Sequence, residues 1–347
     1  MKLGKTQIGL SEKPYIIAEM SGNHNQSLER ALEIVEAAAD SGVDALKIQT
    51  YTPDTMTLNI SEGEFFIEDK KSLWKGKSLY ELYAEAMTPW EWHAPIMERC
   101  KKLNIDFFSS PFDATAVDFL EKLGVSFYKI ASFELNDIPL IKKVAQTGKP
   151  MIMSTGMATV SEIYDAVETA RQNGCKDIVL LKCTSSYPAD PKEANLMTIK
   201  SLRDTFGVEV GLSDHTMGMA VPIAAVAMGA TVIEKHFTIK RADGGVDSAF
   251  SMEPQEFKEM IREVNRAKDA VGSIHFGLTD SELRSRVFRR SVYISEDVKK
   301  GEIFNEKNLR VIRPGLGLQP KYFTTVLGLK AKDNYQKGTP LSWDKIS

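Results

Sequence analysis

The chain has 347 residues, 43% of them hydrophobic, and a formal net charge of −3. This length suits one large domain with a small one, or two to three average domains, and the nearly balanced charge argues against a general nucleic-acid or anionic-membrane binder. Three cysteines without a CxxC pair argue against a disulfide framework and a thiolate zinc site. The sequence has no signal-peptide core and no membrane-length apolar run, so we expect a cytoplasmic protein.

Eight short apolar runs recur through the first 240 residues, and most alternate with amphipathic stretches such as Leu28–Ser41, which is followed by Gly42. Runs that are apolar throughout are typical of strands buried on both faces, and their alternation with helices indicates parallel βαβ units. Eight units favour a closed (β/α)8 TIM barrel in the α/β class. A doubly wound open sheet is the alternative, although no GxGxxG follows a strand. The predicted strands are 15–20, 45–50, 106–110, 127–131, 151–155, 178–183, 209–212 and 231–235, and the further predicted helices are 115–123, 138–146, 161–173 and 219–228.

An unusually long connection, residues 53–89, follows the second predicted strand and contains Trp74 with several tyrosines and lysines. Connections of this length inside a compact domain are usually functional or mobile. This one leaves the C-terminal end of a barrel strand, the end at which barrel enzymes carry their active sites. We therefore expect it to border the functional site.

The pattern changes near residue 280, where the predicted barrel domain of residues 1–280 ends. A basic stretch at 283–290 precedes two short strand-like segments, Ser291–Ile294 and Leu309–Ile312, and a turn-rich segment at 313–317. These features predict a linker and a small β-rich domain over residues 281–347.

Polar side chains gather at the predicted strand ends, where a barrel places its catalytic groups. Lys47 and Lys129 alternate with apolar neighbours, so both should point into the barrel. A buried ammonium without a partner is costly, so each lysine needs a barrel carboxylate such as Glu19 or a doubly charged bound anion. A lysine that forms a Schiff base is a third alternative. Hydroxyl groups that suit a phosphate or carboxylate lie at the same rim, on Ser132, Ser154 and Ser213.

Two histidines, His215 and His236, close the seventh and eighth predicted strands. Neighbouring strands lie about 5 Å apart, so both imidazoles can reach one divalent ion such as manganese or magnesium. The alternative is a pair of hydrogen-bonding pocket histidines. We expect His93 and His275 at the surface, whereas His24, in an Asn-rich turn, either orders that loop or belongs to the site.

Several sequence fragments lie at these strand ends: 17–19 (IAE) with 23–25 (NHN), 47–50 (KIQT), 128–134 (YKIASFE), 153–157 (MSTGM), 211–216 (GLSDHT) and 234–238 (EKHFT). In this order and spacing they resemble the sialic acid synthase family, and the resemblance covers essentially the whole chain. Residues 286–347 resemble the antifreeze-like (SAF) domain that follows the barrel in that family.

Within the family, the pseudaminic acid synthase subgroup is the most similar. The similarity lies in residues 21–26 (SGNHNQ), 49–55 (QTYTPDT), 73–80 (LWKGKSLY) and 88–92 (TPWEW). Sialic and legionaminic acid synthases usually have Gly-Val-Asn-His-Asn-Gly at the first of these segments. They also usually carry Asn after Cys-Thr at the sixth strand, where this chain has Ser185.

The resemblance implies a role for each of the site residues. Catalytic roles fall to Glu19, Lys129 and Glu134. The metal, manganese with magnesium or cobalt as alternatives, would be bound by His215 and His236. The sugar would contact Gln49, Glu134, Tyr187, Asp247 and Arg313. Phosphoenolpyruvate would contact Lys47, Lys129, Ser110, Ser132, Ser154, Ser185 and Ser213.

The resemblance also implies an activity, the condensation of phosphoenolpyruvate with an amino-sugar aldehyde, 2,4-diacetamido-2,4,6-trideoxy-altrose, to give pseudaminic acid and phosphate. It implies a domain-swapped homodimer in which Arg313 of one subunit enters the barrel of the other. The alternatives are an N-acetylneuraminic or legionaminic acid synthase, a Schiff-base aldolase, and a non-catalytic sugar-binding or ice-binding protein.

Overall fold

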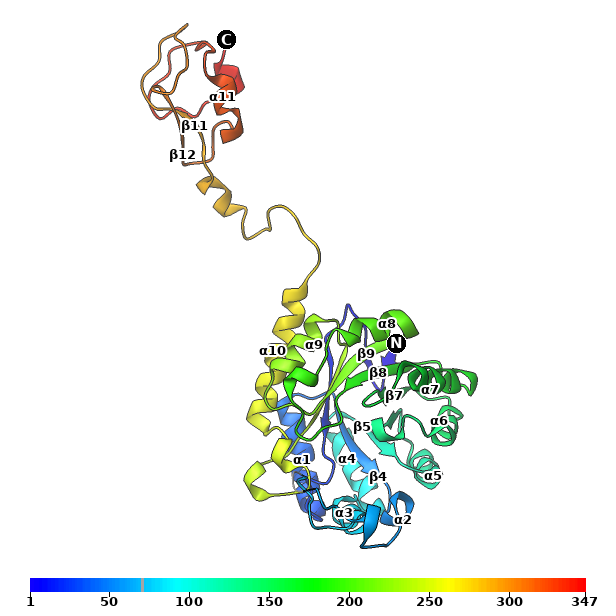
Figure 1. Cartoon of the computed structure of the whole chain (residues 1–347). Coiled ribbons are helices and arrows are strands. Elements are labelled where there is room, and N and C mark those ends of the chain that lie inside the picture. Colours follow the sequence, from blue (N-terminus) through cyan, green and yellow to red (C-terminus); the bar gives the residue numbers. More distant parts are fainter. Residues whose placement is uncertain (70–71) are drawn as a thin grey trace. The chain divides into compact units, whose positions relative to one another are not determined.

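The computed structural model describes residues 1–69 and 72–347, which form two compact units, Met1–Gly272 and Ser273–Ser347. The first unit is a closed barrel of eight parallel strands in the order β10-β3-β4-β5-β6-β7-β8-β9 (Figure 1). Closure confirms the predicted barrel and excludes the open sheet. The strands are β3 (Tyr15–Glu19), β4 (Ala45–Thr50), β5 (Asp106–Pro111), β6 (Tyr128–Ile130), β7 (Met151–Ser154), β8 (Ile178–Cys183), β9 (Glu209–Asp214) and β10 (Val232–His236).

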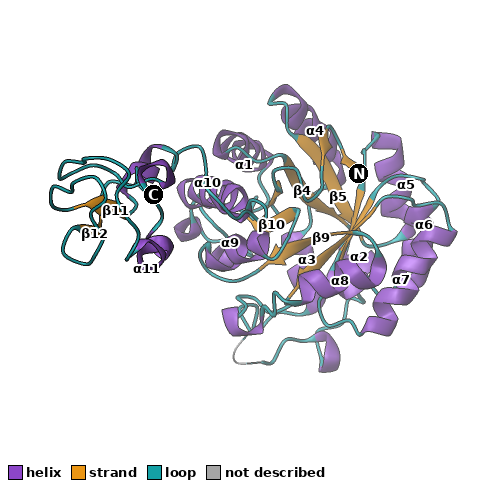
Figure 2. Cartoon of the chain, turned by 90° about the horizontal axis from the view of Figure 1, so that it is seen from above, coloured by secondary structure: helices purple, strands orange, loops and turns teal. Residues whose placement is uncertain are grey.

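Helices form a ring around the strands, as Figure 2 shows from above. Three of them, α4 (His93–Lys102), α8 (Thr198–Phe206) and α10 (Pro254–Val271), were not expected from the sequence. Each is largely polar and presents only a narrow apolar stripe; in α10 the buried residues are Phe257, Met260 and Val264. The other barrel helices are α1 (Leu28–Ser41), α5 (Ala114–Leu123), α6 (Ile138–Ala145), α7 (Val160–Gln172) and α9 (Ala220–Ala227).

Local chemistry determines where these helices begin and end. At the start of α1, the Ser27 side chain accepts a hydrogen bond from the Arg30 amide, as expected of an N-cap serine. At its end, Gly42 adopts a φ of 90°, a left-handed conformation that glycine reaches without steric cost. In the part of the chain that the structure describes, no helix combines the length and apolarity that a bilayer crossing requires.

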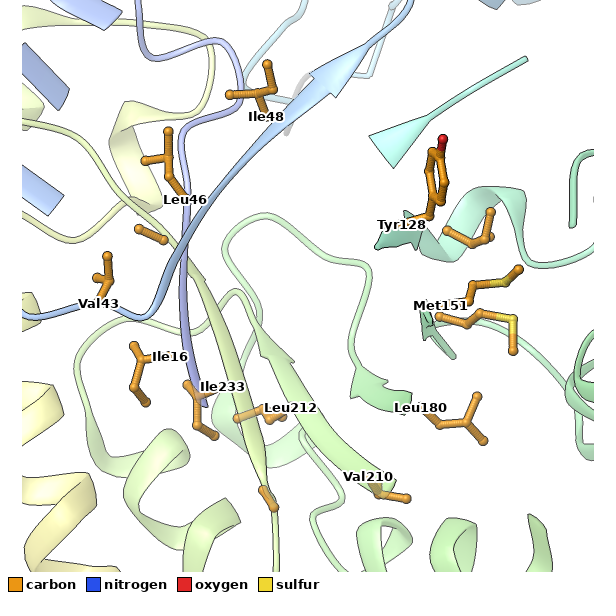
Figure 3. Packing of buried hydrophobic residues seen from close by; sticks show 14 of the residues in the cluster. Ile16, Val43, Leu46, Ile48, Tyr128, Met151, Leu180, Val210, Leu212 and Ile233 are labelled. Carbon is orange, nitrogen blue, oxygen red and sulfur yellow. The ribbon is translucent and has the colours of Figure 1, made fainter. Parts of the chain in front are cut away.

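The apolar core lies in two layers, one between strands and helices and one inside the barrel. Figure 3 shows Ile16, Leu46, Leu212 and Ile233 among the side chains of the outer layer. The inner layer fills the barrel, and a small hairpin, β1 (Lys2–Leu3) with β2 (Thr6–Gln7), contributes to it. Its buried members include Leu3, Ile8, Ile17, Ala45, Phe108, Phe127, Ile152, Val179, Leu181 and Val232.

The long connection after β4 folds into short helices, α2 (Pro53–Met56) and α3 (Leu79–Ala86); residues 70 and 71 lie outside the described residues. Its end is fixed against the barrel by His93. The Nε2 atom of His93 lies 2.8 Å from the Thr50 hydroxyl, and its Nδ1 lies 3.2 Å from the Pro89 carbonyl oxygen.

The surface position expected for His93 was therefore wrong. Its side chain is buried, and burial lowers the pKa of the imidazole to about 4. The tertiary contacts of the first turn of α4, which local sequence does not encode, place it there. His275 is exposed, as predicted.

The second unit is small and β-rich. Its strands β11 (Ser291–Ile294) and β12 (Leu309–Ile312) pair antiparallel, as the sequence predicted. A separate apolar cluster that includes Val292, Phe304 and Leu309 holds this unit together, and a short helix, α11 (Phe323–Val326), packs on it through Val326.

We predict that Gly211→Ala destabilises the barrel. An added Cβ at Gly211 would lie 2.3 Å from the Val232 carbonyl oxygen and 2.8 Å from a Leu181 methyl group. Overpacking of this kind costs about 1–3 kcal/mol, so the free energy of unfolding in urea should fall by that amount. Gly9→Ala is the matched control, since its nearest heavy atom, Oε1 of Glu209, lies 3.7 Å away. Equal unfolding midpoints for the two variants would contradict the prediction.

Candidate active site

The site begins where the apolar filling of the barrel ends. Side chains along a strand point alternately into and out of the barrel. The residue two places after an apolar interior residue therefore also points into the barrel. The pairs are Ile17 with Glu19, Ala45 with Lys47, Phe108 with Ser110, Phe127 with Lys129, Ile152 with Ser154, Gly211 with Ser213, and Val232 with Glu234. One layer of the barrel interior is therefore polar, and it lies at the C-terminal ends of the strands.

Two lysines and two glutamates occupy this layer, all of them buried. The Lys47 ammonium lies 3.1 Å from Oε2 of Glu19 and 3.5 Å from Oε1 of Glu234. The Lys129 ammonium lies 3.5 Å from the same Glu234 oxygen. The inward orientation predicted for both lysines is observed, and each has a barrel carboxylate as its partner.

Glu234 contacts both lysines of this cluster, and the sequence analysis gave it no role. Burial alone would raise the pKa of Glu234, but Lys129 and Lys47 together with a hydrogen bond from Ser213 lower it to about 2. Burial likewise opposes the charge of Lys47, yet Glu19 and Glu234 raise its pKa. Burial lowers the pKa of Lys129, whose ion-pair partner among the described residues is the shared Glu234. The sequence did contain a signal for Glu234. It follows Val232 by two residues, and this spacing places its side chain on the inward face of β10.

Two of the predicted serines, Ser213 and Ser110, contact the cluster. Ser213 donates a 3.0 Å hydrogen bond to Glu234, and Ser110 accepts one from Lys47 at 3.4 Å. The hydroxyl groups of Ser132 and Ser185 lie 2.8 Å apart, close enough to Gly156 that a Cβ there would meet Oγ of Ser185. The Ser154 hydroxyl is buried and has no hydrogen-bond partner among the described residues.

A chain of hydrogen bonds runs from Glu19 to Asp247, which lies beside His236. Nε2 of Gln49 donates to Oε1 of Glu19 at 2.9 Å and to Oγ of Ser21 at 3.1 Å. Ser21 donates in turn to Asp247, whose Oδ2 lies 3.8 Å from Nδ1 of His236. Gln49 and Asp247, both predicted sugar contacts, therefore lie in one network.

His215 and His236 lie side by side, with ring centroids 5.3 Å apart. Nδ1 of His215 lies 2.9 Å from the Thr184 carbonyl oxygen, which can only accept, so this nitrogen carries the proton. Nδ1 of His236 is buried and has no hydrogen-bond partner among the described residues, and burial holds the His236 pKa well below its usual range. The rings of Tyr187 and Phe250 pack on the two imidazoles.

Glu134 and Trp74 complete the rim. Burial raises the pKa of Glu134 to about 7, against the attraction of Lys129, and its Oε2 has no partner among the described residues. Trp74, from the long connection, donates from Nε1 to the Val246 carbonyl at 2.9 Å, and its ring centroid lies 6.1 Å from that of Tyr187. The long connection thus borders the site as expected.

Comparison with known proteins identifies the family. The model of the NeuB family matches residues 34–276, and that of the SAF domain matches residues 289–347. The chain belongs to the NeuB family. Its sequence is 46% identical over 330 residues to a pseudaminic acid synthase of Campylobacter jejuni, covering 95% of this chain and 96% of that protein. A pseudaminic acid synthase of Helicobacter pylori is 45% identical, covering 96% of this chain and 98% of the relative.

Solved structures of this family share the fold. The N-acetylneuraminic acid synthetase of Leptospira borgpetersenii superposes with a TM-score of 0.73 at 33% identity, covering 82% of this chain and 94% of that one. The spore coat polysaccharide biosynthesis protein SpsE of Bacillus subtilis covers 100% of this chain and 99% of its own, with a TM-score of 0.67 and 32% identity. The NeuB and SAF assignments confirm the resemblance read from the strand-end fragments.

Two further residues were singled out from the sequence, Arg313 and His24. Arg313 is exposed and follows β12 in the second unit, so it does not belong to the same unit as the other predicted site residues. His24 is buried, and its imidazole lies 3.3 Å from the Thr88 hydroxyl and packs edge-on against Trp92. These contacts, with the 3.2 Å hydrogen bond that its Nδ1 accepts from the Gln26 amide, fit the ordering of its loop, the first of its two predicted roles.

We predict that Glu134→Gln stabilises the protein at high pH only. The Glu134 carboxyl ionises near pH 7 in the folded chain, against a usual value of 4.5. Between these values the folded state retains a proton that the unfolded state releases, so stability falls as pH rises and the full cost is present above pH 7. The gain in unfolding free energy should therefore be on the order of 1–3 kcal/mol larger at pH 8 than at pH 4. Glu98, exposed on α4, is the control for Glu→Gln exchange, and a gain independent of pH would refute the prediction.

Proposed function

We propose that the chain condenses phosphoenolpyruvate with 2,4-diacetamido-2,4,6-trideoxy-β-L-altropyranose, in its open-chain aldehyde form, to give pseudaminic acid and phosphate. The observation that carries the proposal is 45–46% identity to pseudaminic acid synthases over at least 95% of the chain. The relatives named as N,N'-diacetyllegionaminic acid synthases are 37–38% identical. Other family activities therefore remain the alternatives, and the diacetamido altrose is the substrate best supported.

The buried cluster supports phosphoenolpyruvate as the first substrate. Lys47 and Lys129 share one ionised carboxylate, Glu234, so an incoming anion would add the negative charge that Lys129 lacks. Ser154 offers a hydroxyl that has no hydrogen-bond partner in residues 1–69 and 72–347. Ser110, Ser132, Ser185 and Ser213 would supply further hydrogen bonds to the phosphate or carboxylate. Fixed charges of this kind bind and orient the anion without reorganising during the reaction.

The chemistry follows from the two substrates. The enol carbon of phosphoenolpyruvate attacks the aldehyde carbon, which forms the new carbon–carbon bond and turns the aldehyde oxygen into a hydroxyl group. Water adds to the phosphate-bearing carbon, and cleavage of the bond between this carbon and the phosphate oxygen releases phosphate and leaves the 2-keto acid. Glu134, with its pKa near 7, is suited to exchange a proton with water or a sugar hydroxyl.

The two histidines fit a divalent metal. His215 donates Nδ1–H to a backbone carbonyl, the arrangement that orients metal-binding histidines, so Nε2 is the ring nitrogen that would bind the ion. His236 is buried and its pKa is held well below the usual range, and in the part of the chain that the structure describes its Nδ1 has no hydrogen-bond partner. No group of three or more ligand-type side chains occurs within residues 1–69 and 72–347, so water and substrate oxygens would complete the coordination of manganese, magnesium or cobalt. When bound, the metal supplies Lewis-acid polarisation of the aldehyde oxygen.

We predict a strong preference for the 6-deoxy diacetamido sugar over N-acetylmannosamine. The latter carries a hydroxymethyl group where the former has a methyl group, and the apolar wall that includes Trp74 would leave the extra hydroxyl without a partner. Phosphate release from phosphoenolpyruvate with each sugar should give a kcat/KM ratio of at least about 10, which Trp74→Ala reduces. Tyr164→Ala, an exposed aromatic on α7, is the matched control.

Equal or better turnover of N-acetylmannosamine would reject the pseudaminic assignment. Borohydride trapping of a substrate on Lys47 or Lys129 would instead favour the Schiff-base aldolase. Sugar binding without any phosphate release would favour a non-catalytic protein.

We propose that the chain forms a domain-swapped homodimer, in which the second unit of each subunit serves the barrel of the other. Arg313 of one subunit would then reach the barrel of its partner. A unit this small has little core of its own, and Pro314 restricts the exposed Arg313 to an extended backbone. Such a turn presents the guanidinium group to a sugar oxygen.

We predict that mixing Arg313→Ala and Lys129→Ala subunits restores activity. Each variant alone should be inactive or nearly so, because every site then lacks one group. With Arg313 acting in trans, the heterodimer has one intact site and one site that lacks both groups, so phosphate release reappears after subunit exchange. Verified heterodimers of folded subunits that show no rescue would exclude the shared site.

A further inference from the structure

We propose that the buried ion pair between Asp214 and Lys235 is a brace that sets the separation of His215 and His236. This inference rests on the proposed metal role of the two histidines. Asp214 and Lys235 immediately precede them on the neighbouring strands β9 and β10, and the Lys235 ammonium lies 2.5 Å from Oδ2 of Asp214. Both side chains are almost completely buried, at 2% and 1% relative exposure.

The register of the two strands makes this pair a direct cross-strand contact. Lys235 pairs with Asp214, and one residue earlier Glu234 pairs with Ser213. Glu234 and Ser213 meet inside the barrel through a 3.0 Å hydrogen bond, so the next pair along must meet on the opposite, helix-facing side. Two consecutive polar contacts, one on each face, therefore fix the ends of β9 and β10 against a slip in register.

The same ammonium also fixes the segment that follows His215. Lys235 donates to the Thr216 carbonyl, while Asp214 accepts hydrogen bonds from the Thr216 amide and hydroxyl, each at 3.1 Å. The backbone of His215 is thereby held from both sides. On β10, the His236 carbonyl accepts a 2.9 Å hydrogen bond from the Met252 amide, which fixes the other histidine.

Stability alone does not account for charges at this position. Taking an ammonium and a carboxylate out of water costs several kcal/mol, and apolar residues of similar size are often as stabilising as a buried pair. A charge-assisted hydrogen bond, however, specifies distance and direction, which an apolar contact does not. Two histidines that share one ion need such positional accuracy, because a small change in spacing between them weakens coordination by either one.

The test compares metal binding by Lys235→Met and Lys149→Met in the full-length chain. The control, Lys149, forms an equally short ion pair, 2.5 Å, with Glu121, which is not one of the site residues described above. Supporting partners of metal-binding histidines typically contribute 10–100-fold in affinity. Calorimetric titration with Mn²⁺ should give an affinity at least about tenfold weaker for Lys235→Met than for wild type, and an unchanged one for Lys149→Met. The visible spectrum of bound Co²⁺ should change only in Lys235→Met.

Thermal unfolding and phosphoenolpyruvate binding are followed in parallel, since a brace acts on the histidines and leaves Lys47 and Lys129 in place. Asp214→Asn, which keeps hydrogen-bonding capacity and loses the charge, provides a second variant if Lys235→Met does not fold, and the same loss of affinity is expected. Wild-type Mn²⁺ affinity in a folded Lys235→Met or Asp214→Asn chain would overturn the brace alone. Absence of Mn²⁺ binding by the wild-type chain would overturn the metal site itself, and the brace with it.

Discussion

Oε1 of Glu234 lies 3.5 Å from the ammonium groups of both Lys47 and Lys129 inside the barrel, and the arrangement of the site depends on these two contacts. Two buried ammonium groups repel each other and lose their hydration, so both need carboxylate partners to remain charged, and Glu234 is the partner that they share. Glu234 keeps its charge because both lysines and Ser213 lower its pKa. Among the described residues Glu19 pairs with Lys47 alone, so Lys129 keeps only a share of Glu234 and is left partly unneutralised, which suits a small bound anion.

The barrel makes this cluster possible through its alternation of inward and outward side chains. Apolar residues fill the barrel interior, and on seven of the eight strands the polar layer begins two residues after the last apolar interior residue, near the C-terminal end of the strand. The outward residues of the same strands hold the structure in register, most clearly in the contact between Lys235 and Asp214. Neighbouring strands thus bring together groups that are far apart in sequence, and the order of the barrel determines which of them meet.

Much of this could be predicted from the sequence, because continuous apolar runs and a period of two are local signals. The eight strands and the inward orientation of Lys47 and Lys129 followed from them. The helices α4, α8 and α10 did not, since their apolar stripes are narrow. Neither the burial of His93 nor the role of Glu234 was predictable, because both depend on partners that only the closed barrel supplies.

Titration of phosphoenolpyruvate into the wild-type chain and Lys129→Met tests the central claim most directly, because methionine keeps the length of the side chain and removes its charge. Hydrogen bonds to charged groups contribute about 1.5–3 kcal/mol, so the affinity measured by calorimetry should fall at least about tenfold. Lys182→Met is the control, since the Lys182 ammonium donates to the Cys183 carbonyl at 2.8 Å, and it should bind like wild type. Unchanged phosphoenolpyruvate affinity in a folded Lys129→Met chain would contradict the account.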